Sequence, residues 1–257
     1  MEFLTQGNPE KPVIVFFHAL GVTGEIYARI AHYLINDFFL IMPTSTAFCA
    51  HKVYISKKRE IEEIEAFLAS HAICKIELIV ASSQGCDLAL SFILKSTIPL
   101  HHIFFDGGQF AQINKFQRLF LTPIMYYTIR NSYKSGGKFL PEIMDYEYEE
   151  AKPFFIQAGK NLDYRSLKHL IKDSFIHTGL PSLPVKTQKK IIFCFGSQEN
   201  HIKYRNTVMA QYPYSSFPVF TKWKHLEFQA KDPKGFAQLL SSLIKQGNLL
   251  SSSEIHY

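Results

Sequence analysis

The chain has 257 residues, of which 47% are hydrophobic and 19% are charged, and its formal net charge is +6. This composition is ordinary for a folded enzyme and argues against an intrinsically disordered chain. No stretch approaches the ~20 consecutive apolar residues of a membrane-spanning helix. The Lys and Arg residues form no dense run with interleaved aromatic residues, so we expect no nucleic-acid partner.

The cysteines and the first residues predict a reducing, cytoplasmic location. Cys49, Cys74, Cys86 and Cys194 show neither a CxxC spacing nor a Cys/His ligand spacing, so they predict no metal site, and we expect no cofactor. Two of them lie in apolar segments, as small core residues do in reducing compartments. Residues 1–6 lack the basic segment followed by an apolar one that is typical of a secretory signal.

Apolar runs alternate with amphipathic stretches over the first hundred residues. We predict buried strands over residues 12–17, 38–42 and 102–105, and another that begins at Ile76. We predict helices over residues 25–35 and 57–70, and a third that follows Gly85. Residues 1–4 could add one strand at the edge of the sheet.

This alternation stops between residues 108 and 185. The stretch holds helical pieces over residues 110–127, 141–159 and 164–176, and we interpret it as an inserted helical cap. Alternation resumes with strands over residues 190–195 and 217–220 and helices over residues 201–211 and 233–245. We therefore predict an α/β core of residues 1–107 and 186–257, in which helices flank a mostly parallel sheet, and a cap of residues 108–185. Ligands of such a sheet bind at the carboxyl ends of its strands.

A small-x-Ser-x-small pattern joins the strand that begins at Ile76 to the next helix. Ser83 has Ala81 two positions before it and Gly85 two positions after it, as a sharp strand-to-helix turn requires. Such a turn raises the serine hydroxyl above the end of the strand, at a backbone strain of roughly 1–3 kcal/mol. The neighbouring Ser82 fails this test because larger residues lie two positions away on both sides. Ser83 is therefore the candidate nucleophile.

A serine hydroxyl becomes a good nucleophile only when a base removes its proton. Of the eleven histidines, His225 lies in the loop between the last predicted strand and the last predicted helix, at the same edge of the sheet as Ser83. His201, at the start of a helix, is the weaker alternative, and His177 belongs to the predicted cap. We expect His225 to be the base.

The base needs a carboxylate to hold it, and the reacting carbonyl oxygen needs N–H donors. Glu199 and Asp106 each follow a predicted strand, and we favour Glu199 as the acid, with Asp106 as the alternative. The residue after the nucleophile, Gln84, supplies one backbone N–H at a helix N-terminus. We expect the second oxyanion-hole donor to be the N–H of Leu20, in the glycine-containing loop after the first central strand.

Together these residues resemble the α/β-hydrolase superfamily. Its nucleophile turn reads Gly-x-Ser-x-Gly, and its triad follows the chain order Ser, Asp or Glu, His. Residues 81–85 match this turn with alanine in the first place, and residues 18–21 are similar to the family's oxyanion loop with the first glycine replaced. Residues 196–199 are similar to its acid turn and residues 224–226 to its histidine loop. The resemblance covers residues 13–245.

The resemblance implies a serine hydrolase that cleaves an ester or thioester through an acyl-enzyme intermediate. Aromatic residues in the predicted cap, such as Phe116 and Phe155, suggest a small-molecule acyl substrate that is partly apolar and is chosen by the cap. Packing of the cap onto the core explains these aromatic residues equally well. The same fold also hosts acyltransferases and lyases. The altered glycines in two motifs keep a further alternative open, a non-catalytic binding protein on this fold. The sequence leaves the substrate and the oligomeric state open.

Overall fold

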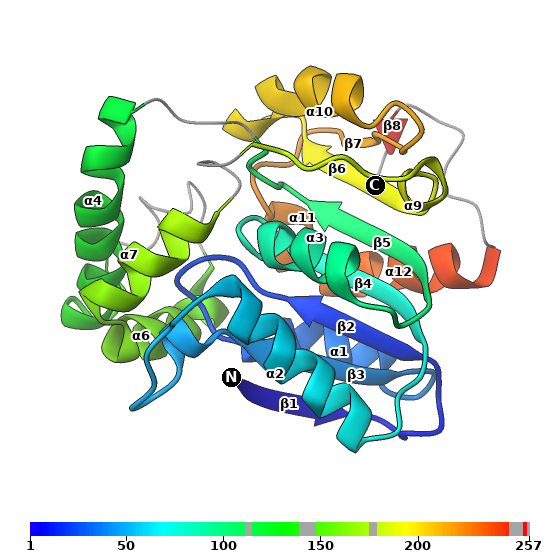
Figure 1. Cartoon of the computed structure of the whole chain (residues 1–257), viewed down its shortest axis with the longest axis horizontal. Coiled ribbons are helices and arrows are strands. Elements are labelled where there is room, and N and C mark those ends of the chain that lie inside the picture. Colours follow the sequence, from blue (N-terminus) through cyan, green and yellow to red (C-terminus); the bar gives the residue numbers. More distant parts are fainter. Residues whose placement is uncertain (111–114, 139–147, 175–178, 247–253, 256–257) are drawn as a thin grey trace.

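The computed structural model describes residues 1–110, 115–138, 148–174, 179–246 and 254–255, and one sheet lies at its centre (Figure 1). The strands are β1 (Glu2–Gln6), β2 (Val13–Phe17), β3 (Phe39–Thr44), β4 (Ile76–Ser82), β5 (Leu100–Asp106), β6 (Ile191–Gly196), β7 (Val219–Phe220) and β8 (Glu254–Ile255). Their spatial order is β1-β3-β2-β4-β5-β6-β7-β8. β1 pairs antiparallel with β3, and the other neighbours pair parallel. The predicted mostly parallel sheet is confirmed.

Helices cover both faces of this sheet (Figure 1). α1 (Ala28–Leu34) and α12 (Pro233–Gln246) pack on one face, and α2 (Lys57–Ser70), α3 (Gly85–Lys95) and α10 (Arg205–Gln211) on the other. The connections contain the short helices α9 (Val185–Gln188) and α11 (Glu227–Lys231), and the 3-10 helices η1 (Gly24–Tyr27), η2 (Thr46–Phe48), η3 (Glu149–Ala151) and η4 (Asn200–Tyr204). α2 agrees with its prediction at both ends, because the Ser56 hydroxyl accepts a hydrogen bond from the Arg59 N–H and so caps the first turn.

Strand β2 illustrates why the central strands are apolar throughout. Successive side chains of a strand point to opposite faces of its sheet. Val15 and Phe17 accordingly pack with α2 and α3, whereas Ile14 and Phe16 pack with α1 and α12. Since both faces are covered, all five β2 residues are buried. The rigid strand ends that result are where the polar loops of the molecule begin.

In the described part of the segment between β5 and β6, three helices lie beside the carboxyl edge of the sheet (Figure 1). α4 (Lys115–Lys134), α6 (Lys152–Asn161) and α7 (Tyr164–Asp173) share an apolar cluster with η2. α4 continues past the predicted end at residue 127, and two glycines with positive φ, Gly136 and Gly137, follow its last turn. Within the described residues, the helix predicted over 141–159 begins only at Lys152, because Pro153 suits a first helical turn. Residues 139–147 and 175–178, with His177, lie outside the described residues, and the division into core and cap remains a prediction.

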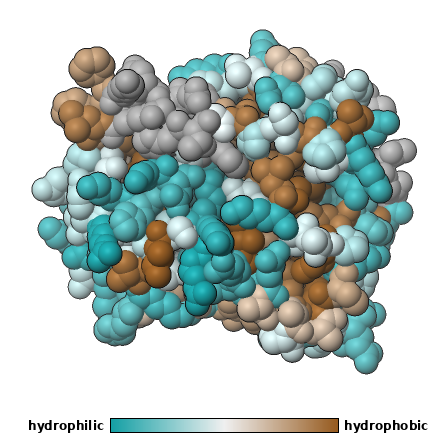
Figure 2. Space-filling model, in the orientation of Figure 1, coloured by the Kyte–Doolittle hydropathy of each residue, from teal (hydrophilic) through white to brown (hydrophobic). Residues whose placement is uncertain are grey.

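Hydrophilic and hydrophobic residues are interspersed on the face of the molecule shown in Figure 2. The outer face of α4 carries several exposed apolar side chains, namely Phe116, Leu119, Phe120, Ile124 and Tyr127. Among the described residues, no helix has both the length and the hydropathy that a membrane span requires.

Candidate active site

The turn between β4 and α3 holds Ser83 in a left-handed backbone conformation. Its φ is +50°, which few non-glycine residues adopt without strain. The Ser83 N–H donates to the Asp106 carbonyl at 2.8 Å, so the turn is fixed to the end of β5. Gly85 is required two positions later, because a Cβ there would lie 2.2 Å from the Phe17 carbonyl oxygen. This is the sharp turn that the small-x-Ser-x-small pattern predicted.

His225 and Glu199 form a short hydrogen bond on the other side of this edge. His225 Nδ1 lies 2.5 Å from Glu199 Oε2. The Glu199 side chain is fully buried, whereas 31% of the His225 side chain is exposed. Since a carboxylate oxygen can only accept, Nδ1 carries the ring proton of the neutral imidazole and Nε2 keeps a lone pair. A neutral histidine in this tautomer can accept a proton at Nε2.

The loop that carries His225 is held against the turn that carries Glu199. The Gln198 N–H donates to the Trp223 carbonyl at 3.0 Å, and the Lys222 N–H donates to Ser197 Oγ at 2.8 Å. A Cβ at Gly196 would lie 2.3 Å from the Trp223 carbonyl oxygen, so only glycine allows this approach. The Gly196 N–H also donates to Glu199 Oε1 at 3.1 Å. Backbone contacts between the ends of β6 and β7 thus fix the histidine and the carboxylate relative to each other.

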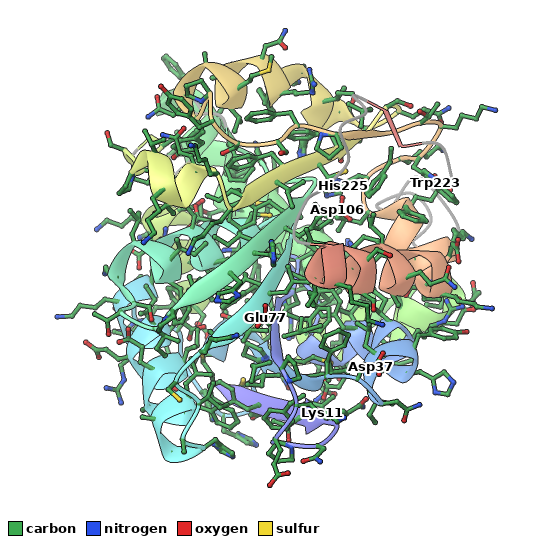
Figure 3. All side chains as sticks on the ribbon, turned by 90° about the vertical axis from the view of Figure 1, so that its right-hand side faces the viewer. Lys11, Asp37, Glu77, Asp106, Trp223 and His225 are labelled. Carbon is green, nitrogen blue, oxygen red and sulfur yellow. The ribbon has the colours of Figure 1, made fainter. Side chains whose placement is uncertain are left out.

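Asp106, the alternative acid, is labelled beside His225 in the view of Figure 3, but among the described residues no hydrogen bond joins the two side chains. Its side chain is buried, and among the described residues its Oδ2 has no hydrogen-bond partner. Burial raises the pKa of Asp106 well above its ordinary value, and the charge of Glu199 raises it further. The ionised form of Asp106 is therefore disfavoured, and Glu199 is the carboxyl group that hydrogen-bonds the imidazole.

Gly107 and His201 enclose the His225–Glu199 pair. Gly107 has a φ of +61°, and a Cβ there would lie 2.6 Å from His225 Nδ1 and 3.0 Å from Glu199 Oε2. His201 Nδ1 donates to the Gly107 carbonyl at 3.0 Å, and the rings of His201 and His225 meet edge to face with centroids 4.7 Å apart. Burial, and then the neighbouring His225, lower the pKa of His201. His201 therefore packs against the predicted base rather than replacing it.

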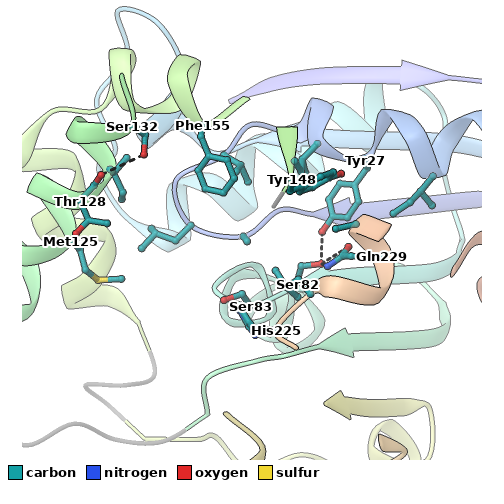
Figure 4. Close-up of a pocket in the computed structure, with 18 residues that line it drawn as sticks. Tyr27, Ser82, Ser83, Met125, Thr128, Ser132, Tyr148, Phe155, His225 and Gln229 are labelled. Carbon is teal, nitrogen blue, oxygen red and sulfur yellow. Dashed lines mark hydrogen bonds between the residues drawn. The ribbon is translucent and has the colours of Figure 1, made fainter. Parts of the chain in front are cut away.

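Ser83 and His225 line the same cavity, whose volume is about 250 Å³ (Figure 4). Its walls are mainly apolar, with Leu20, Val22, Ile26 and Ile30 from the core and Met125, Ile129, Tyr148 and Phe155 from the segment between β5 and β6. No Asp, Glu, Lys or Arg is among the described residues that line it. The cavity therefore suits an uncharged, largely apolar group next to the Ser83 hydroxyl.

A polar network at the wall of this cavity was missed by the sequence analysis (Figure 4). Gln229 Nε2 donates to Ser82 Oγ at 3.0 Å, and the Tyr27 hydroxyl lies 2.8 Å from Ser82 Oγ and 2.9 Å from the Phe17 carbonyl oxygen. The Ser82 hydroxyl is thus buried and hydrogen-bonded to Tyr27 and Gln229. The Ser83 side chain, in contrast, makes no hydrogen bond to the described residues. The three members come from β4, η1 and α11, so no local pattern links them.

The two predicted oxyanion donors also lie near Ser83. Leu20 lines the cavity, and Gln84 immediately precedes α3. Neither of their N–H groups donates a hydrogen bond to a described residue, whereas most N–H groups of a folded chain are paired. Both residues therefore remain candidates for the oxyanion hole.

The fold of the chain is shared with solved structures. It is similar to a protein from Desulfitobacterium hafniense described as belonging to the alpha/beta hydrolase family, with a TM-score of 0.73, 16% identity and coverage of 95% of this chain and 100% of that chain. The chain has the α/β-hydrolase fold. A thermophilic esterase from Thermogutta terrifontis (TM-score 0.71, 12% identity, 96% of this chain and 94% of that chain) and the carboxylesterase CesB from Bacillus subtilis (TM-score 0.69, 13% identity, 96% and 88%) have it too. No family model matches the sequence, and no curated protein matches it either.

Within the α/β-hydrolase fold, the candidate residues come from separate loops at one edge of the sheet. Ser83 follows β4, Glu199 follows β6, and His225 lies between β7 and α11. The short α11 was not predicted, and it places Gln229 against the cavity directly after the histidine loop. At these low sequence identities the likeness concerns the fold, and the chemistry has to be argued from the site.

Proposed function

We propose that this chain is a serine hydrolase that cleaves a carboxylic ester or thioester through an acyl-enzyme. The observation that carries the proposal is the Glu199–His225 hydrogen bond beside a cavity that Ser83, strained at φ +50°, also lines. In this proposal Ser83 is the nucleophile, His225 the base and Glu199 the acid that orients it. Asp106 is a buried neighbour without a direct role in proton transfer.

Each residue has one task in the proposed reaction. His225 Nε2 takes the proton from Ser83 Oγ while this oxygen attacks the carbonyl carbon of the substrate. The resulting oxyanion accepts hydrogen bonds from the N–H groups of Leu20 and Gln84, and each such donor is worth on the order of 10²–10³ in rate. The protonated imidazole then gives its proton to the departing alcohol or thiol. Water, activated by the same histidine, releases the acid from Ser83.

The cavity limits the substrate that we propose. A 150 Å³ cavity holds benzene, so about 250 Å³ accommodates a somewhat larger group. Its walls offer no charged partner among the described residues apart from His225 when protonated, so a charged acyl group would lose its hydration without compensation. We therefore propose a neutral, partly apolar ester. Met125 and Ile129 of α4 and Phe155 of α6 form one wall, which supports the proposal that the predicted cap of residues 108–185 chooses the substrate.

Hydrolysis of p-nitrophenyl esters and acyl thioesters of graded chain length tests this function. Wild-type protein should hydrolyse short and medium neutral chains, and Ser83→Ala should reduce the rate to background. Ser91→Ala is the matched control, because Ser91 lies in α3 and, within the described part of the chain, its hydroxyl bonds only the Asp87 carbonyl. A folded wild-type protein that hydrolyses none of these compounds, or a Ser83→Ala variant that retains the rate, contradicts the proposal and favours a binding protein.

A further inference from the structure

His201 gives the candidate active site a feature that the proposed reaction does not use. One carboxylate oxygen of Glu199 and one imidazole nitrogen each of His201 and His225 lie within 4.8 Å of one another. The sequence analysis considered only the spacing of the cysteines and predicted no metal site. These three residues come together only where the ends of β6 and β7 meet. Two imidazoles and one carboxylate are also the ligand set of many zinc sites.

The distances suit a tetrahedral ion after a small rearrangement. Zinc bonds of about 2.0–2.1 Å place neighbouring ligand atoms about 3.3 Å apart. Glu199 Oε2 and His225 Nδ1, now 2.5 Å apart, would have to separate slightly, and the longest distance in the cluster, at most 4.8 Å, would have to shorten. Water or a cavity ligand would complete the coordination.

The tautomer of His201 suits an ion at this place, whereas the His225 ring proton has to leave Nδ1. His201 Nδ1 donates to the Gly107 carbonyl, which leaves its Nε2 with a lone pair for a metal. Gly107 has no side chain, so the space beside His225 Nδ1 and Glu199 Oε2 is not filled by a Cβ. The two histidines are partly exposed, and His225 also lines the cavity.

We propose that Glu199, His201 and His225 form a reversible zinc site that switches the proposed hydrolase off. The binding claim rests on the cluster alone, and the inhibition claim rests on the proposed function. When zinc takes the Nδ1 lone pair of His225, the ring proton moves from Nδ1 to Nε2, with no net gain or loss of protons. Nε2 then cannot accept the Ser83 proton, and Glu199 becomes a ligand instead of a hydrogen-bond acceptor. Mg²⁺ and Ca²⁺ prefer oxygen ligands and should not bind.

Calorimetric titration of Ser83→Ala protein with zinc chloride tests binding without reference to catalysis. We expect one zinc ion per chain, and no binding of magnesium chloride under the same conditions. Adding His201→Asn to this background should weaken zinc binding at least about tenfold, as loss of a metal partner does. His32→Asn, a substitution of an exposed histidine on α1, is the matched control and should leave the affinity unchanged.

A second measurement tests the switch. Zinc should abolish ester hydrolysis by wild-type protein, in which Ser83 is intact, and EDTA should restore it. The His201→Asn variant should hydrolyse the ester without metal and should keep this activity at the zinc concentration that inhibits wild type. Unchanged zinc affinity in His201→Asn, or no binding to Ser83→Ala protein, overturns the site. Binding with unaltered hydrolysis overturns the switch. If no variant hydrolyses esters while zinc still binds through His201, the proposed function fails and the metal site stands.

Discussion

Replacing Glu199 by glutamine separates the two candidate acids. Two donors converge on the Glu199 carboxylate, the Gly196 N–H at 3.1 Å and His225 Nδ1–H at 2.5 Å. A carboxylate accepts both, but an amide has one oxygen and one NH2 group. In Glu199→Gln the oxygen can serve only one donor. If it serves Gly196, the NH2 group faces Nδ1 and forces the proton onto Nε2, where it blocks attack by Ser83.

The expected magnitude follows from this change of tautomer. Turning the orienting carboxylate of a serine triad into an amide lowers kcat by roughly 10⁴-fold, which corresponds to about 5 kcal/mol of transition-state stabilisation. We expect a loss of this order in Glu199→Gln, because its side chain is fully buried and water cannot replace the missing acceptor. Asp106→Asn should stay within about threefold of wild type, since Asp106 makes no hydrogen bond to the imidazole.

The assay is kcat and KM on the best p-nitrophenyl ester, with circular dichroism to show that both variants are folded. The loss in Glu199→Gln should lie in kcat, because the proton transfer and not substrate binding is affected. If Asp106→Asn loses more activity than Glu199→Gln, Asp106 is the acid and the assignment is wrong.

Further predictions concern the buried groups around the site. Because burial raises the pKa of Asp106, this carboxyl group ionises at lower pH in the unfolded chain than in the folded one. In urea unfolding, Asp106→Asn should therefore be more stable than wild type at pH 7 and lose this advantage below about pH 4, the ordinary Asp pKa. Equal stabilities at pH 7 would contradict a raised pKa of the buried carboxyl group. Burial lowers the pKa of His18 from 6.5 to about 4, so on acidification the unfolded chain takes up this proton first. The free energy of unfolding should therefore fall by about 3 kcal/mol between pH 6.5 and about pH 4. The same fall in His18→Asn would show that His18 is not its source. Gly107→Ala places a Cβ 2.6 Å from His225 Nδ1 and should lower kcat at least about tenfold while leaving the protein folded; wild-type kcat would show that the pair tolerates displacement.

Local patterns predicted much of the fold and most of the candidate site. The helix over residues 57–70 was found at both ends because apolar periodicity and a capping serine are local signals. Ser83 was found because the turn selects small neighbours, and His225 and Glu199 because parallel strands bring their carboxyl ends to one edge.

The features that were missed depend on contacts across the chain. The length of α4 is set by packing against α6 and α7 as well as by its own sequence, so its end was misplaced. The network that joins Tyr27, Ser82 and Gln229 crosses three elements. Nothing local shows that His201 packs on His225, because only the approach of the two loops after β6 and β7 creates this contact. The sequence likewise gave no distance from His225 to Glu199 or Asp106, and only the folded chain brings Glu199 into hydrogen-bond contact with the imidazole.

Labelling with a fluorophosphonate tests the central claim most directly, because the probe reacts only with a serine whose proton can be removed and whose oxyanion is stabilised. Intact-mass and peptide analysis of the folded wild-type protein should show one phosphonyl adduct, on Ser83, and Glu199→Gln should label far more slowly. Folded protein that remains unlabelled, or that carries the adduct on another residue, would contradict a serine hydrolase built on Ser83, His225 and Glu199.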